Sequence, residues 1–190
     1  MNPVTFWGND GQRGAYLLWM RASEETVVSF GRFRGGLPVT ITAGRYVYVG
    51  SAMGWSGATA LAGRLLRHAT RSGGRPPHAI REAMMRSFAV AGLGDPPLRP
   101  PSLKRLHWHV DYLLDEPAVT LEQVTVIRAD ARLESALARQ LAALPDVSPL
   151  LIGLGAGDAP GETHLLRLDD GAILPTEFAP NAEILTLIRA

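Results

Sequence analysis

Hydrophobic and polar residues alternate along much of the chain in short runs that are typical of β-strands. The clearest run is 45–51, Arg-Tyr-Val-Tyr-Val-Gly-Ser, in which Tyr46 and Tyr48 alternate with valines between Gly44 and Gly50. Its period near two predicts a short strand that ends in a glycine turn and carries both phenols on one face. Similar patterns predict strands at 14–20, 27–30, 39–41, 119–127 and 163–168.

Other segments have the spacing of amphipathic helices. Residues 59–70 place three leucines on one side and leave Arg64, Arg67 and His68 available to the other. Asp130 is a good N-cap for a helix through 144, because its carboxylate can accept from free backbone N–H groups. Further helices are expected at 78–86 and 103–114, a strand fits 108–113 as well, and 182–190 fits either a strand or a helical turn.

Glycine and proline mark the irregular segments. Residues 1–13 resemble a loose leader, and 72–77 should break the preceding helix sharply. Residues 89–102, rich in proline, glycine and arginine, are expected to form an insertion loop. The glycine-rich run 153–157 is interpreted as a turn, because no clear nucleotide-binding strand precedes it and no lysine follows it.

Composition excludes several kinds of site. The chain has 190 residues, 46% of them hydrophobic, which suits one soluble domain over 1–190 with a sizeable core. It has no cysteine, so disulfides, zinc fingers and iron–sulfur clusters are excluded, and any metal must bind oxygen or imidazole. Neither a signal peptide nor a run of about 20 apolar residues is present. We therefore expect a cytoplasmic protein without a membrane partner.

The net charge of +1 conceals an asymmetry along the chain. Residues 61–109 carry nine arginines and lysines against two carboxylates, a net charge of +7. Residues 110–190 carry five arginines against thirteen carboxylates, a net charge of −8. A basic segment of this kind can form a positive face for a polyanion. It is equally compatible with a solvated, arginine-rich surface.

Five residues supply groups that phosphodiester hydrolysis requires. The reaction needs a positioned water, a base that takes its proton, and a cation that neutralises the developing charge. Taken singly, strand tyrosines often pack in a core, and helix arginines or glutamates often lie at the surface. The occurrence of all five residues in one chain, in order and at plausible spacing, favours a shared functional role over five separate structural ones. The five residues are Tyr16, Tyr48, Arg64, His68 and Glu134.

Three separated blocks match one nuclease superfamily in order. They are Gly-Arg-Tyr-Val-Tyr-Val-Gly-Ser-Ala at 44–52, Arg-Leu-Leu-Arg-His at 64–68, and His-Trp-His-Val-Asp-Tyr-Leu-Leu at 107–114. Together they resemble the GIY-YIG nuclease superfamily, in particular its Uri-type branch. The resemblance covers a core of about 12–168.

Two superfamily motifs fall on predicted strands. Gly14-Ala15-Tyr16 resembles the first motif, glycine-isoleucine-tyrosine, with alanine in place of isoleucine, and Tyr48-Val49-Gly50 resembles the second, tyrosine-isoleucine-glycine. The expected fold class is therefore α+β, with a small, mainly antiparallel sheet flanked by helices. Insertion strands at 27–30 and 39–41 are expected to enlarge that sheet.

The resemblance implies a metal-dependent endonuclease that hydrolyses phosphodiester bonds in DNA. Tyr16 or Tyr48 would be the general base, and a tyrosine base needs a neighbouring cation because a free phenol titrates near ~10. Arg64 would bind the scissile phosphate. His68 would relay the proton or contact phosphate.

A carboxylate is expected to hold the metal. The family has a glutamate on the helix after its third strand, which implies Glu134 as the protein's metal ligand, with Glu122 as the competing candidate. A single carboxylate suits Mg²⁺, which retains several waters, and Mn²⁺ is the alternative cofactor.

DNA is the expected partner, RNA is an alternative, and no protein partner is implied. Without a helix-turn-helix or zinc finger, recognition should depend on backbone or structure more than on base sequence. Repair or recombination intermediates would suit such recognition. The residues expected to contact nucleic acid are Gly50, Ser51, Arg67, Arg71, Lys104, Arg105, His107 and His109.

Two other functions stay open from the sequence. His107, His109 and Asp111 alternate, so on a strand they would share one face as half of a metal site, which His164 or Asp158 could complete. A metal hydrolase centred on this block is one alternative. The other is a catalytically inactive module that keeps the fold and binds nucleic acid.

Overall fold

One six-stranded, mainly antiparallel sheet organises the protein in the computed structural model, which describes residues 2–155 and 162–189. The strand order is β1-β6-β2-β5-β8-β7, and only the β1–β6 pair among these is parallel. The strands are β1 (Val4–Gly8), β2 (Gly14–Ala22), β5 (Gly44–Ala52), β6 (Val119–Arg128), β7 (Val147–Pro149) and β8 (Leu165–Leu168).

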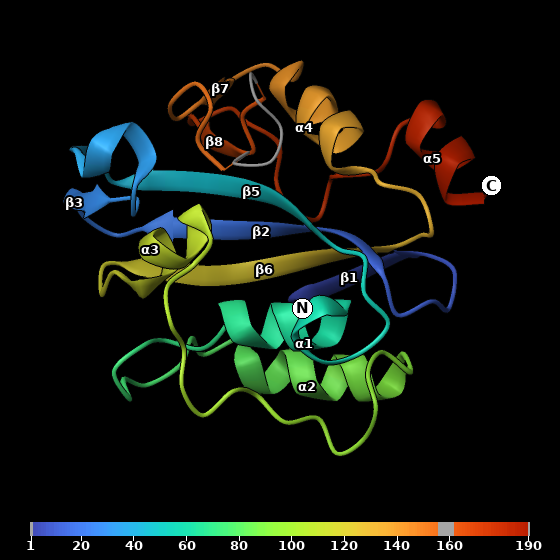
Figure 1. Cartoon of the computed structure of the whole chain (residues 1–190). Coiled ribbons are helices and arrows are strands. Elements are labelled where there is room, and N and C mark those ends of the chain that lie inside the picture. Colours follow the sequence, from blue (N-terminus) through green and yellow to red (C-terminus); the bar gives the residue numbers. More distant parts are fainter. Residues whose placement is uncertain (1, 156–161, 190) are drawn as a thin grey trace.

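Helices cover both faces of the sheet, which confirms the expected α+β class (Figure 1). Alternate side chains of the central strand β2 point to opposite faces, with Tyr16 and Leu18 on one face and Leu17 and Trp19 on the other. α1, α2 and α3 pack on the Tyr16 face, and α4 and α5 pack on the Trp19 face. The helices are α1 (Leu61–His68), α2 (Arg81–Val90), α3 (His109–Asp115), α4 (Glu134–Ala142) and α5 (Ala182–Arg189).

The two insertion strands exist, but they do not enlarge the main sheet as expected. β3 (Thr26–Ser29) and β4 (Pro38–Ile41) pair with each other in a separate two-stranded sheet. A short 3₁₀ turn at Phe33–Gly36 joins them. The hairpin lies outside the direct pairing of β2 with β5, in which Tyr16 is opposite Gly50. The two strands that carry the tyrosine motifs are therefore neighbours.

The N-terminal segment is not a loose leader, which corrects the sequence-based expectation. β1 forms one edge of the sheet and pairs in parallel with β6. Val4 is buried, and the ring of Phe6 lies edge-on to Phe88 of α2 with 6.3 Å between the centroids. Turn-forming residues on both sides hid this short strand in the sequence.

α3 begins at His109 and not at 103, and the strand considered for 108–113 is absent. The carboxylate of Asp111 accepts hydrogen bonds from the backbone N–H groups of His107 and Trp108, each at 3.0 Å. These bonds stabilise an extended Trp108 before the first turn. The apolar pattern in front of 109 therefore belongs to an irregular segment.

Other boundaries also differ from the predictions. Asp130 does not cap α4, which begins at Glu134, because its carboxylate pairs with Arg13 at 2.6 Å. α2 occupies Arg81–Val90, so the irregular insertion begins after Val90. The strand β7 was not predicted, and the C-terminal segment is helical. Among the described residues, no helix has both the length and the apolar character needed to cross a membrane.

His78 links three parts of the core. Its Nε2 donates to the carbonyl of Leu114 at 2.9 Å, and its Nδ1 accepts from the backbone N–H of Leu121 at 3.1 Å. This arrangement requires a neutral ring, because one nitrogen donates and the other accepts. Burial, together with the charge of Arg71, lowers the pKa of His78 to about 4.

We predict that His78 makes stability depend on pH between its unfolded and folded pKa values. The unfolded state binds a proton near pH 6.5 and the folded state only near pH 4, so the stabilisation present above 6.5 is lost as pH falls. In urea unfolding at pH 7, 5.5 and 4, the free-energy difference between wild type and His78→Gln should shrink by about 3 kcal/mol. A difference that stays constant with pH would contradict the prediction.

Candidate active site

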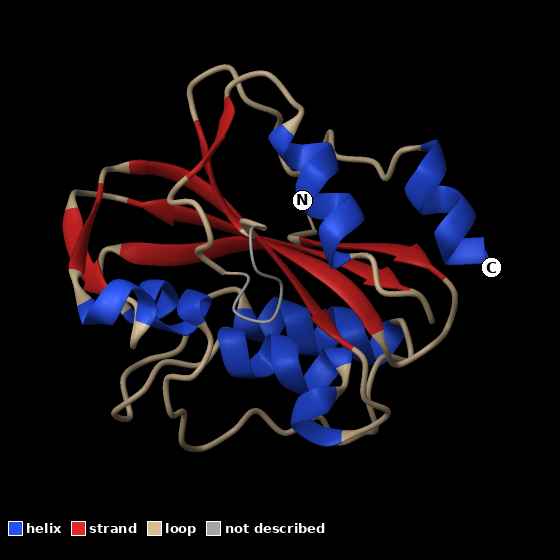
Figure 2. Cartoon of the chain, turned by 45° about the horizontal axis from the view of Figure 1, so that its top comes forward, coloured by secondary structure: helices blue, strands red, loops and turns tan. Residues whose placement is uncertain are grey.

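A cleft with polar walls lies where β5 extends beyond its neighbour β8. β8 pairs with β5 as far as Tyr48, and one further bond joins Val49 N–H to the carbonyl of His164 at 2.8 Å. Beyond that point the beginnings of α1 and α4 approach from opposite sheet faces (Figures 1 and 2). The cleft has a volume of about 480 Å³. Its walls include Tyr16, Tyr48, Ser51, Thr59, Arg64, His107, Trp108, His109, Arg132, Glu134 and Gly155.

Gly50 makes room for the ring of Tyr16. A Cβ atom at position 50 would lie 2.5 Å from both Cζ and Oη of Tyr16. Gly50 is buried, whereas the sequence interpretation placed it against nucleic acid. In the structure its contribution is steric: the missing side chain lets the phenol of β2 lie across the neighbouring strand.

Tyr16, His68 and Asp111 form a continuous hydrogen-bonded chain. The hydroxyl of Tyr16 lies 2.9 Å from Nε2 of His68, and Nδ1 of His68 lies 3.2 Å from Oδ1 of Asp111. An ionised carboxylate only accepts, so Nδ1 must carry the imidazole proton. Nε2 is then the acceptor and Tyr16 the donor. The arrangement of hydroxyl, base and orienting carboxylate has the connectivity of a catalytic triad.

Asp111 is fully buried and its charge is balanced inside the protein. Arg67 Nη1 lies 2.8 Å from one carboxylate oxygen, and Lys104 Nζ lies 3.4 Å from the other. Burial raises the pKa of Asp111, but the hydrogen bond from His68 and the charges of Lys104 and Arg67 lower it more. The net effect holds the pKa well below its usual range, so the carboxylate stays ionised.

Several expected nucleic-acid contacts face inward instead. The side chain of Lys104 is completely buried, and that of Arg67 is only 16% exposed. Arg71 donates to the backbone carbonyls of Glu116 and Val119. Some of the basic residues between 61 and 109 therefore pair with polar groups inside the protein and do not contribute to a positive surface. Arg105 and His107 are exposed, and Ser51 is half-buried in the cleft wall.

Burial holds both Tyr16 and His68 in their neutral forms. It raises the pKa of Tyr16 well above 10.0; the nearby phenol of Tyr48 adds to this shift and the charge of Arg64 opposes it. Burial also lowers the pKa of His68 below 6.5, against the opposing effect of Asp111. At neutral pH the phenol keeps its proton and the imidazole can accept one. Tyr16 therefore cannot act as a preformed phenolate.

Tyr48 and Arg64 complete the walls beside this chain. The ring centroid of Tyr48 lies 6.4 Å from that of Tyr16 and 6.5 Å from that of His68. The guanidinium of Arg64 lies 4.5 Å from the ring centroid of Trp108 and donates through Nη1 to the carbonyl of Ser51 at 3.2 Å. These contacts fix a cation at the cleft wall without using its Nη2.

Glu134 reaches the cleft from the other layer of the protein. It is half-buried at the first position of α4, where the helix dipole favours a negative charge. Among described residues its carboxylate makes no hydrogen bond or ion pair. One carboxylate suits Mg²⁺, which is often bound by one or two carboxylates, retained waters and substrate phosphates. The competing Glu122 lies outside the cleft and pairs with Arg21 at 2.8 Å.

Within the part of the chain that the structure describes, the histidine block does not form the metal site considered as an alternative. His109 Nδ1 accepts from the backbone N–H of Gly155 at 3.0 Å, whereas Asp111 points into the core. His164 instead lies 3.0 Å from Glu162. Over residues 2–155 and 162–189, no group of three or more histidines and carboxylates could hold a metal ion. Asp158, the other suggested ligand, lies outside the described residues.

Comparison with known proteins relates the chain that forms this cleft to one family. A family model described as "Domain of unknown function DUF123" matches residues 15–186. The chain belongs to the DUF123 family. The match runs from β2 to α5 and so includes every residue of the cleft described above. No curated protein and no solved structure matches this chain.

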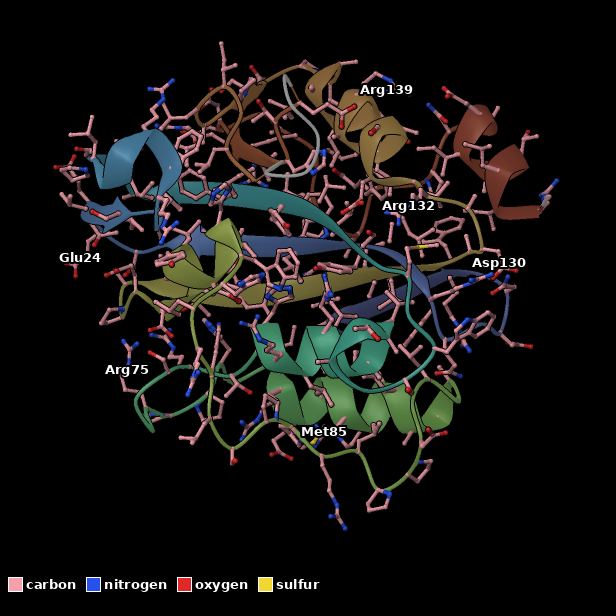
Figure 3. All side chains as sticks on the ribbon, viewed as in Figure 1. Glu24, Arg75, Met85, Asp130, Arg132 and Arg139 are labelled. Carbon is pink, nitrogen blue, oxygen red and sulfur yellow. The ribbon has the colours of Figure 1, made fainter. Side chains whose placement is uncertain are left out.

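Sequence reasoning missed two residues of this site. Asp111 was considered only as a metal ligand, because its partner His68 is 43 positions away in the chain. Arg132 lies in the cleft wall just before α4 and is exposed (Figure 3). Arg132 fell inside the helix predicted from Asp130 to 144, and nothing in that pattern indicated that it would line a cleft. Tyr16, Tyr48, Arg64 and Glu134 do converge on the cleft, and His68 reaches it through Tyr16.

We predict that Gly50→Ala displaces the ring of Tyr16 and breaks its bond to His68. Overpacking of this kind should cost about 1–3 kcal/mol of unfolding free energy. In a Tyr16→Leu background the same substitution should cost less, because the shorter side chain leaves space for the methyl group. Urea unfolding of the four variants of this double-mutant cycle measures the difference. Equal costs in both backgrounds would contradict the steric role of Gly50.

Proposed function

We propose that this DUF123 domain is a metal-dependent endonuclease of the GIY-YIG type that hydrolyses phosphodiester bonds in DNA. The observation that supports this most is the convergence of Tyr16, Tyr48, Arg64 and Glu134 on one cleft from four separate elements. Their order in the chain is the order of the superfamily motifs they resemble. The cleft therefore contains the hydroxyl of Tyr16 with its bond to His68, the fixed guanidinium of Arg64 and the carboxylate of Glu134.

The proposed base is Tyr16 acting through His68. As the oxygen of Tyr16 takes a proton from the attacking water, its own proton passes to Nε2 of His68. Asp111 stabilises the resulting imidazolium through Nδ1. The hydroxide forms a bond to phosphorus, the bond from phosphorus to the leaving oxygen breaks, and that oxygen takes a proton from solvent. His68 then releases its proton, which completes the addition of water across the bond.

Arg64 and Tyr48 are proposed to hold the phosphate. The guanidinium of Arg64 is fixed by Ser51 and by the ring of Trp108, so it can neutralise charge on the phosphate oxygens without reorganising. Tyr48 lies beside Tyr16 in the same wall and supplies the second hydroxyl. Glu134 would hold Mg²⁺ or Mn²⁺, which when bound polarises the phosphate and lowers the pKa of coordinated water.

The basic residues around the cleft support the proposal of a polyanionic partner. Exposed Arg105 and His107 lie on the segment that leads into α3, and Arg132 lies on the opposite side before α4. Phosphate contacts by such groups are independent of sequence, so we expect recognition of backbone and structure. DNA repair or recombination intermediates would suit this mode, and RNA is an alternative substrate.

We predict that wild type cleaves at least one of a panel of labelled single-stranded, duplex, flap and four-way DNAs when Mg²⁺ or Mn²⁺ is added. Tyr16→Phe should lower kcat by about 10²–10⁴-fold, because the relay loses its hydroxyl. Arg64→Ala should lower it by about 10²–10³-fold. Tyr48→Phe and Glu134→Gln should also lower it strongly.

Matched controls separate chemistry from folding. Tyr112→Phe and Glu122→Gln change the same residue types outside the cleft, so they should retain wild-type rates. Circular dichroism of each variant checks that the fold is intact. Salt-sensitive binding of every DNA without any cleavage would contradict the nuclease and favour the inactive binding module. Cleavage that survives both Tyr16→Phe and Arg64→Ala would place the chemistry elsewhere or in a contaminant.

A further inference from the structure

Trp55 is the one tryptophan of the chain that is mostly exposed, at 66%. It lies on the loop of residues 53–59, which connects the end of β5 to α1. The same loop supplies Met53, Gly54 and Thr59 to the wall of the catalytic cleft. The exposed indole therefore lies on a loop that also lines the proposed phosphate site.

The loop that carries Trp55 is held in a defined shape. Gly54 N–H donates to the carbonyl of Thr59 at 3.0 Å, and the hydroxyl of Thr59 donates to the carbonyl of Ser56 at 2.9 Å. A Cβ atom at position 54 would lie 2.0 Å from Oγ1 of Thr59, so only glycine fits there. The indole is consequently presented by a closed loop.

The indole is also supported from one side. The guanidinium of Arg13 lies 4.1 Å from its ring centroid, and Asp130 holds Arg13 by an ion pair. Asp130 is placed at the end of the sheet near this loop (Figure 3). A cavity of about 190 Å³ adjoins the indole and is also lined by Ser56, Asp95 and Arg99.

The chemistry of this cavity favours a nucleobase over a phosphate. Arg99 lies in the cavity wall together with Asp95, and Arg13, which contacts the indole, is paired with Asp130. The surroundings therefore have no net charge to attract an anion. Ser56 and the charged groups can instead meet the donors and acceptors on the edge of a base. The volume is below the roughly 300–1,000 Å³ typical of drug-sized ligands.

We propose that Trp55 is a stacking platform for one unpaired nucleobase next to the scissile phosphate. Stacking on an aromatic side chain requires a free base face, which bases inside a duplex do not offer. The substrate class is therefore single-stranded DNA, or branched DNA with an unpaired arm. This inference rests on the proposed nuclease function, since it places the base beside the phosphate at Arg64.

The test compares Trp55→Ala with wild type on a single-stranded oligonucleotide and on a blunt duplex of the same sequence, in Mg²⁺. Trp55→Ala should raise KM on the single strand by at least about 5-fold, the effect of losing one stacked base. Any cleavage of the duplex, which offers no free base face, should be unaffected by the substitution. Trp55→Phe should retain most of the wild-type KM. Leu37→Ala, which changes another apolar side chain that is 66% exposed, should have no effect.

Abasic nucleotides make the test specific to stacking. An abasic residue placed at successive positions around the cleavage site should raise the wild-type KM at one position, and Trp55→Ala should add nothing there. An equal effect of Trp55→Ala on single strand and duplex, or no effect on either, would overturn the proposal.

A separate outcome identifies failure of the nuclease proposal itself. If wild type cleaves none of these DNAs, fluorescence anisotropy of a labelled oligothymidine without metal still measures the stacking site. Weaker binding by Trp55→Ala, with Leu37→Ala unchanged, would retain the platform on a non-cleaving module. Binding that is independent of Trp55 would overturn it.

Discussion

The buried carboxylate of Asp111 is the constraint on which the rest of the site depends. It must be compensated within the protein, by Arg67, Lys104 and His68 and by two backbone N–H groups in front of α3. Removing one partner of such a buried ion pair typically costs about 3–5 kcal/mol, because the remaining charge stays buried. The carboxylate therefore ties α1, the segment before α3 and α3 itself into one geometry.

That geometry determines what the cleft can do. Because Asp111 orients the imidazole of His68, the nitrogen that faces Tyr16 is an acceptor, and burial keeps both rings neutral. When the phenol of Tyr16 passes its proton to His68, the negative charge of Asp111 is already in place to stabilise the imidazolium. The early end of β8 leaves the edge of β5 open, so Glu134 from the opposite layer can face the same space.

The strands at 14–20, 45–51 and 119–127 could be predicted, because they lie in the middle of the sheet and their apolar runs are long. β1 could not be predicted, because its few apolar residues form no clear pattern and the strand is defined by its pairing with the distant β6. Motif order also predicted that Tyr16, Tyr48, Arg64 and Glu134 belong together, and all four line one cleft. The inward direction of Lys104 and the steric role of Gly50 could not be foreseen, because the partners of both residues lie on other elements. Local patterns identify elements, whereas long-range contacts decide which polar groups face a ligand.

The most direct test of the proton relay is the imidazole ¹⁵N spectrum of His68, assigned by comparison with His68→Gln and followed from pH 8 to pH 5. The relay predicts a neutral ring at neutral pH, with the proton on Nδ1 and an unprotonated Nε2, and titration only below pH 6.5. Asp111→Asn should perturb this tautomer and lower the rate of cleavage together. A proton on Nε2, or an imidazolium already present at pH 7, would contradict the assignment of Tyr16 and His68 as the base.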